Sequence, residues 1–193
     1  MPHADSSYFA PGSSKEQVYD HIVEHTRALT EGQRNWVRYS WRTANLANAA
    51  SLLWHGYGCL PSPSSSVNWA GFYIRADKLQ SATSSTGSPD LKRTLLLGPF
   101  QGKPACQWIK FGKGVCGTSA DRAQTVIVPD VLEWEGHIAC DAESRSEIVV
   151  PIVVDAEVVA IIDVDCTEAN GFDEIDKKGL EALAALLAVC CDW

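Results

Sequence analysis

Near both ends of the chain, apolar residues recur at three- and four-residue steps, which is the spacing of one helical face. This pattern predicts a first helix from Ser13 to about Leu29, with Ser13 and Glu16 placed as a capping box. The Leu- and Ala-rich end of the chain should form a closing helix, capped within the segment from Asn170 to Asp173. Helices are therefore expected at both ends.

A second helix should follow the first almost directly. Apolar residues, among them Trp36 and Val37, continue at helical spacing from Thr30 or Glu31 until Gly56 and Gly58 stop the pattern. The chain between the helical ends changes character, because its apolar residues alternate with polar ones or form short runs. This pattern predicts strands at residues 67–75, 93–97, 125–128, 147–154 and 158–166.

The order of these elements predicts the fold class. Two Ser-rich segments, residues 60–66 and 81–89, are typical of loops, and the last two strands are close enough to form a hairpin. Two or three N-terminal helices, five or six strands and a closing helix predict an α+β fold with an antiparallel sheet, and the pattern lacks parallel crossovers. We expect a flexible arm at residues 1–12 and one domain at residues 13–193.

The composition of the chain argues against several classes of partner. The 193 residues carry 24 acidic and 16 basic side chains, a formal charge of −8, which argues against nucleic acid and anionic membranes as partners. Seven cysteines are an odd number, and no signal-peptide pattern opens the chain, so we expect a reducing, cytoplasmic compartment. The longest apolar run, residues 148–154, is too short to cross a bilayer. The partners should be small molecules or proteins.

Three acids stand near the ends of the last two strands. Asp163 and Asp165 are two residues apart, so they share one face of a strand. They could simply be hydrated where the strand reaches solvent, or they could form an acidic pocket that binds a cation or shares a proton. Glu147 joins them only in one hairpin register. A two-residue loop sends Glu147 to the opposite face, whereas a three-residue loop or one bulge places it opposite Asp165.

Aromatic residues on the strand at 67–75 give a second candidate. Trp69, Gly71 and Tyr73 share a face, and Phe72 points to the other. Aromatic residues on strands usually belong to the core. The glycine between Trp69 and Tyr73 would also leave a gap walled by rings, which suits a methyl or thioether group.

The cysteines divide into two groups. Cys59, Cys166, Cys190 and Cys191 lie at element ends and are interpreted as small apolar residues. Three more, Cys106, Cys116 and Cys140, lie in polar, turn-rich surroundings. For these three, packing, a zinc site with His137 as fourth ligand, and redox chemistry are the alternatives. Zinc is disfavoured because the spacing lacks two close ligand pairs.

The motifs NWAGFY, GPFQGKPACQWIKFGKGVCGTSA, HIACDAESRSEIVVPI and IIDVDC together resemble the free methionine-(R)-sulfoxide reductases, a family with the GAF fold. The resemblance runs from the second helix to the last. The chain departs from the family in its N-terminal arm, in a longer Ser-rich loop near Ser81 and in four additional cysteines, which leave alternative disulfides open.

The resemblance implies roles for the cysteines. Cys140 would be the nucleophile, Cys106 the resolving cysteine and Cys116 an auxiliary thiol, although the order of attack between Cys116 and Cys140 stays open. The sulfenic acid left on the nucleophile would condense to a disulfide, which a thioredoxin-type dithiol protein would reduce. The resemblance implies no cofactor and no metal.

The resemblance also implies how substrate is held. Glu147 and Asp165 would share the proton that the departing oxygen needs, and Asp163 would hold the ammonium group of the free amino acid. Trp69 and Tyr73 would cage its S-methyl end.

Two other function classes remain open. A sensory GAF module would bind a cyclic nucleotide or tetrapyrrole without catalysis, and a stand-alone thiol sensor would form the same disulfide without preferring methionine sulfoxide. The apolar content of the N-terminal helices also indicates a surface through which a homodimer could form.

Overall fold

The computed structural model describes residues 9–32, 44–79, 90–135 and 141–193. Its helices are α1 (Lys15–Thr30), α2 (Ala44–Gly58), α3 (Gly114–Arg122) and α4 (Glu174–Cys190), joined by short 3₁₀ turns. Its strands are β1 (Val67–Arg75), β2 (Thr94–Gly102), β3 (Trp108–Lys110), β4 (Val126–Val128), β5 (Ser146–Val154) and β6 (Glu157–Cys166).

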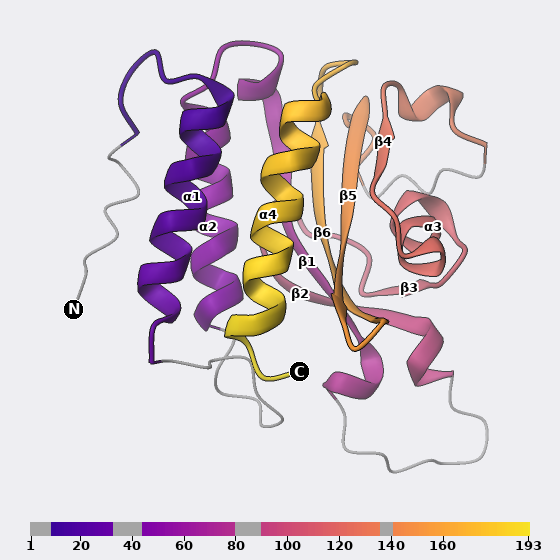
Figure 1. Cartoon of the computed structure of the whole chain (residues 1–193). Coiled ribbons are helices and arrows are strands. Elements are labelled where there is room, and N and C mark those ends of the chain that lie inside the picture. Colours follow the sequence, from indigo (N-terminus) through magenta and orange to yellow (C-terminus); the bar gives the residue numbers. More distant parts are fainter. Residues whose placement is uncertain (1–8, 33–43, 80–89, 136–140) are drawn as a thin grey trace.

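The six strands form one antiparallel sheet in the order β3-β2-β1-β6-β5-β4. Helices α1, α2 and α4 lie side by side on one face, and α3 packs on the other side of the sheet (Figure 1). The α+β class and the antiparallel sheet are confirmed. Each face of the sheet carries its own apolar cluster, and the smaller cluster, beside α3, surrounds the site described below.

The N-terminal helices differ from the sequence prediction at their ends. The capping box of α1 uses Ser14 and Gln17, one residue beyond the predicted pair. Thr30 is the last residue of α1 and Glu31 its C-cap, so the second helix does not begin there. Trp36 and Val37 lie outside the described residues.

The expected arm at residues 1–12 is only partly described. Residues 1–8 lie outside the described residues, but Phe9 is buried in the helical core and its ring lies 4.6 Å from that of His21. The core therefore begins before residue 13.

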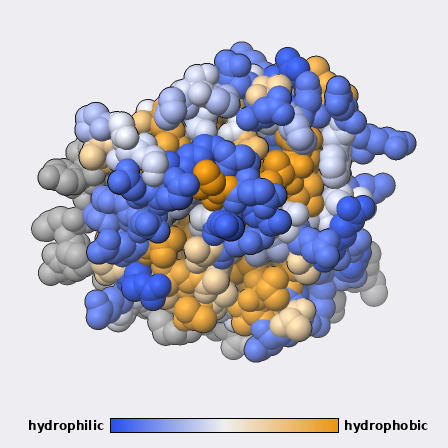
Figure 2. Space-filling view, turned by 45° about the horizontal axis from the view of Figure 1, so that its top comes forward, coloured by the Kyte–Doolittle hydropathy of each residue, from blue (hydrophilic) through white to orange (hydrophobic). Residues whose placement is uncertain are grey.

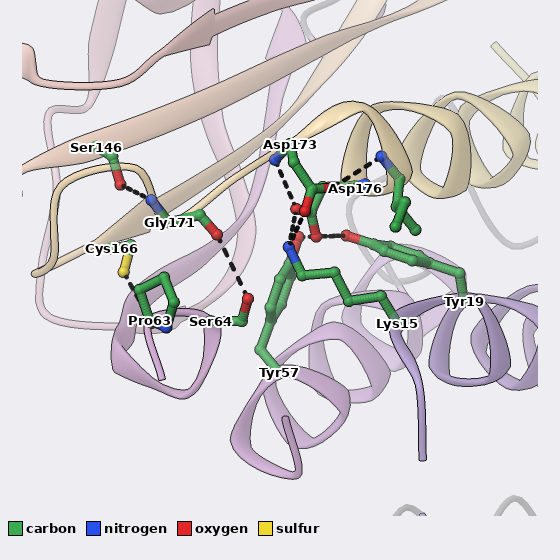
Figure 3. Close-up of polar contacts among 11 residues, drawn as sticks. Lys15, Tyr19, Tyr57, Pro63, Ser64, Ser146, Cys166, Gly171, Asp173 and Asp176 are labelled. Carbon is green, nitrogen blue, oxygen red and sulfur yellow. Dashed lines mark hydrogen bonds and ion pairs between the residues drawn. The ribbon is translucent and has the colours of Figure 1, made fainter. Parts of the chain in front are cut away.

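A polar network ties the three helices together (Figure 3). The Tyr19 hydroxyl contacts the Tyr57 hydroxyl and donates to Asp176 Oδ1 at 3.0 Å, joining α1, α2 and α4. Lys15 pairs with Asp176 and, at 3.0 Å, with Asp173, the N-cap of α4. Asp176 is fully buried, and its contacts with Tyr19 and Lys15 compensate for its lost hydration. The network fixes the helical layer against which the sheet packs.

The β5–β6 hairpin combines two features that the sequence offered as alternatives. Its loop has two residues, Asp155 and Ala156, both with left-handed φ, as a type I′ turn requires. A register shift follows between Ile152 and Val153 on β5, where β6 carries an extra residue. Because of this bulge, Glu147 lies opposite Asp165.

The surface in the view of Figure 2 is mainly hydrophilic, with several separate hydrophobic patches. Within the described ranges, none of the helices combines the length and the apolar character that a bilayer span needs.

Candidate active site

A cavity of about 260 Å³ opens on the α3 side of the sheet. Strands β1, β5 and β6 form its floor, and α3 with the segment after β2 forms its walls. Seven residues singled out from the sequence line it, namely Trp69, Tyr73, Cys106, Cys116, Glu147, Asp163 and Asp165. Cys140 and His137 lie outside the described residues. Residues up to 96 positions apart in the chain thus meet in one place.

The three predicted acids converge on the cavity floor. Glu147 pairs with Asp165 across the hairpin, and Asp163 lies on the same face two residues earlier. Glu147 and Asp163 are each only 5% exposed, and Asp165 is half-buried. Asp163 Oδ1 is buried without a hydrogen-bond partner. The view that both aspartates are merely hydrated is therefore wrong for Asp163.

Burial and mutual repulsion shift the pKa values of these acids. Burial raises the pKa of Asp163 to about 6, while hydrogen bonds from Cys116 and Glu147 limit the rise. Burial, followed by the charge of Asp163, raises the pKa values of Glu147 and Asp165 well above their usual range. Near neutral pH Asp163, with a pKa of about 6, is mainly ionised, and burial together with this charge favours the protonated forms of Glu147 and Asp165.

Cys116 lies in the first turn of α3 and points at this cluster. Its Sγ donates to Glu147 Oε1 at 3.5 Å, and the residue is 7% exposed. A helix N-terminus lowers the pKa of a thiol, but here burial, and then the charge of Asp163, raises it well above its usual range. Cys116 is thus a protonated thiol in the resting cavity. A side chain at Gly117 would collide with the Lys110 carbonyl, so this glycine permits the close approach of α3.

The aromatic wall differs in one respect from the expected cage. The Trp69 ring stacks on Tyr73 at 5.8 Å and on Phe100 at 5.2 Å, and Trp69 Nε1 donates to the Lys103 carbonyl. The space above Gly71 is filled, because Phe100 Cα lies 2.7 Å from where a Cβ would stand. The expected gap between the rings is absent. Trp69 and Tyr73 still line the cavity.

Sequence reasoning missed the polar rim of the cavity. Lys103 pairs with Asp141 at 3.1 Å, and Asn68 donates to Asp141 and to Ser144. Trp108, Lys110 and Lys113 also line the opening. All three lysines stand in the same motif as Cys106 and Cys116, with Lys110 and Lys113 in the run WIKFGKG, and that proximity was the available signal. They bring positive charge to an opening whose floor is acidic.

The comparisons with known proteins agree with this architecture. Residues 70–191 match the GAF domain family, which confirms the expected GAF fold. The chain is 45% identical to the free methionine-R-sulfoxide reductase of Saccharomyces cerevisiae over 98% of this chain and 94% of that protein. It is 37% identical to the Escherichia coli protein of the same name, over 90% and 88%. It also resembles the free methionine-R-sulfoxide reductase from Neisseria meningitidis, solved with its substrate, with a TM-score of 0.76 and 33% identity over 95% and 93% of the chains.

Proposed function

The chain belongs to the free methionine-(R)-sulfoxide reductases, oxidoreductases of the GAF family that act on a sulfur group, and from this premise we propose a thiol mechanism that reduces free L-methionine-(R)-sulfoxide. The observation that carries the proposal is the convergence of Cys106, Cys116 and three acids on one cavity. That convergence supplies thiols as reductants and carboxylic acids as proton donors. The two needs of sulfoxide reduction are thus met in one place.

Substrate recognition would depend on the negative charge of Asp163. An ammonium group beside Asp163 would give its buried, unpartnered Oδ1 a donor. A methionine residue within a peptide carries no ammonium group at that position, so this contact selects the free amino acid. Trp69 and Tyr73 would contact the S-methyl end and select one sulfoxide configuration by shape.

The chemical step needs a nucleophilic thiol and an acid. The cysteine sulfur attacks the sulfoxide sulfur, the S–O bond breaks, and the oxygen is transferred to the cysteine as a sulfenic acid while the sulfide product leaves. Glu147 and Asp165, whose pKa values are raised by burial and by the charge of Asp163, would supply the proton that the oxygen requires. A raised pKa is the direction of shift that a carboxylic acid needs to act as a general acid.

We assign the attack to Cys140 and resolution to Cys106, with Cys116 as the auxiliary thiol. The sulfenic acid condenses with the Cys106 thiol to a disulfide and releases water. A thioredoxin-type dithiol protein then reduces this disulfide by exchange. The 3.5 Å contact of Cys116 with Glu147 favours the alternative order, in which Cys116 attacks first. The variants below separate the two orders.

A phosphate-bearing ligand fits the cavity poorly. Its negative charge would meet Asp163 and two acids that cannot ionise without further repulsion. This argues against a cyclic-nucleotide sensor.

The test is an NADPH-coupled assay with thioredoxin and its reductase on three substrates: free R-sulfoxide, free S-sulfoxide and peptide-bound sulfoxide. We expect turnover of the free R form alone. Equal turnover of the peptide-bound form would contradict the proposed contact between Asp163 and the substrate ammonium group.

Cysteine variants test the roles of the thiols. Cys140→Ser should abolish turnover, and Cys106→Ser should release one methionine per chain and then stop, because recycling is lost. Cys59→Ser is the control, since Cys59 is exposed and lies outside the cavity, and it should keep full activity. If Cys140→Ser still gives one methionine per chain while Cys116→Ser gives none, Cys116 is the nucleophile.

A further inference from the structure

Cys116, Glu147 and Asp163 form a second constellation within the same cavity. One ligand atom from each side chain, a thiol sulfur and two carboxylate oxygens, lies within 4.8 Å of the others. All three residues are buried. We propose that this group binds one thiophilic divalent cation, of which zinc is the prototype, and that the bound ion excludes substrate from the cavity.

The distances suit a small ion. Two ligands of a tetrahedral zinc, with bonds of about 2.0–2.3 Å, lie about 3.5 Å apart. Cys116 Sγ and Glu147 Oε1 are already 3.5 Å apart. The carboxylates come from neighbouring strands of a rigid hairpin, and the thiol comes from the first turn of a helix. The remaining pairs of ligand atoms lie within 4.8 Å of each other, so binding of the ion calls only for rotation about side-chain bonds.

Asp163 supplies an independent sign that a cationic ligand belongs here. The residue is 95% buried, it lines the cavity, and its Oδ1 has no hydrogen-bond partner. A buried carboxylate oxygen without a donor is costly, and a cation removes that cost. The same oxygen faces the place proposed for the ammonium group of the substrate. Metal and substrate would therefore compete for it.

The donor set selects the class of ion. A thiolate with two carboxylates suits zinc and its heavier analogue cadmium, whereas magnesium and calcium prefer oxygen donors alone. On binding, the S–H bond of Cys116 breaks, a sulfur–metal bond forms, and the proton leaves to solvent. No electron is transferred, so no oxidant or reductant is needed. An ion on Cys116 and Glu147 would also occupy a thiol and a proton donor that catalysis needs, and would therefore inhibit the enzyme. This inhibition rests on the proposed function, whereas the binding of the ion does not.

The test uses cadmium ion on the reduced full chain, because a cadmium–thiolate bond has a charge-transfer absorption in the ultraviolet. The reference protein carries Cys59→Ser, which removes an exposed thiol from the background. We expect one equivalent of cadmium to saturate the absorption, with zinc displacing it and magnesium without effect. Added free methionine, which carries the same ammonium group and cannot oxidise the thiols, should weaken cadmium binding in proportion to its own occupancy.

Three variants locate the ion. Cys116→Ser should weaken binding by at least roughly 100-fold, because even outer contacts of a metal site are worth about 10–100-fold. Asp163→Asn should weaken it by roughly 10-fold or more and keep the absorption at saturation, since the thiolate remains. Asp141→Asn is the matched control, a carboxylate on the same cavity that lies outside the group, and should change little. Cys116→Ala serves if the serine variant loses its thermal transition.

Unchanged cadmium affinity in both Cys116 variants, or equal effects of Asp163→Asn and Asp141→Asn, would overturn the proposal. The absorption is measured without turnover. A chain that binds cadmium at Cys116 but reduces no sulfoxide would refute the proposed function and leave the metal site standing. A chain that reduces the sulfoxide but shows no cadmium–thiolate absorption would refute the metal site and leave the proposed function standing.

Discussion

Replacing Asp163 by asparagine should stabilise the fold above pH 6 and leave it nearly unchanged at pH 4. Asparagine keeps the shape of the side chain and removes its charge. Burial raises the pKa of Asp163 from 3.8 to about 6, a shift of about two units. At 1.36 kcal/mol per unit, the ionised side chain costs the folded state about 3 kcal/mol. Asp163→Asn carries no such charge, so its free energy of unfolding should be higher by about this amount.

The sign follows from the direction of the shift. A carboxyl group whose folded pKa lies above its unfolded value favours folding fully below the unfolded pKa, and that contribution is lost as pH rises through the folded value. The advantage of Asp163→Asn should therefore grow between about pH 4 and pH 6 and stay constant above. For a chain of this size, about 3 kcal/mol corresponds to a rise of about 6–12 °C in Tm.

The assay is urea unfolding of both proteins at pH 4, 6 and 8, followed by far-ultraviolet circular dichroism. Asp141→Asn is the matched control with the opposite expectation, because the Glu143 backbone N–H and Lys103 lower the pKa of Asp141. That variant should gain nothing at pH 8. An advantage of Asp163→Asn that is equal at pH 4 and pH 8 would show that its charge is not penalised by burial.

The same substitution should damage function. Without the charge of Asp163, the substrate ammonium group loses its partner, and breaking a buried charge pair costs about 2–5 kcal/mol. KM for the free sulfoxide should rise by roughly 30-fold or more, with a smaller change in kcat. An unchanged KM would remove the ammonium role from Asp163. Stability and substrate binding thus make opposite demands on this side chain.

Two further predictions concern packing and the helical network. Gly71→Ala should destabilise the fold by about 1–3 kcal/mol or more in urea unfolding, since the new methyl group meets the backbone of β2, whereas Gly58→Ala, with open space around it, should cost much less. Tyr19→Phe and Tyr57→Phe should each cost about 1–2 kcal/mol, and the double variant less than their sum, because both remove one shared hydrogen bond. Additive costs would show that the hydroxyls act independently.

The sequence predicts those parts of the fold that local pattern determines. Alternation on β1 correctly separates Trp69 and Tyr73 from Phe72, because neighbouring side chains on a strand must point to opposite faces. The helix α3 was missed, since its sequence GVCGTSADR is small and polar and has no apolar stripe. Its place is set by close approach at Gly117 rather than by helical propensity.

Two features of the candidate site depend on tertiary structure and could not be predicted from local sequence pattern. Spacing placed Asp163 and Asp165 on one face, but only the hairpin register brings Glu147 to them, and both registers satisfied the local pattern. The gap expected at Gly71 is absent because Phe100 of β2 fills it. The sequence of β1 alone does not reveal where β2 lies. Roles for individual cysteines stay predictions that the variants above test.

The bulge in the β5–β6 hairpin bears on how related sequences should be aligned. A hairpin with the same two-residue turn, one residue shorter and without the bulge, would pair the same two acids, Glu147 and Asp165. A three-residue turn with no bulge would pair them as well. A one-residue gap in this region is therefore no sign that a relative has lost its acid pair. Such an alignment should be judged by whether the residue paired with Glu147 across the strands is an acid. The length of the turn can vary without breaking this pair.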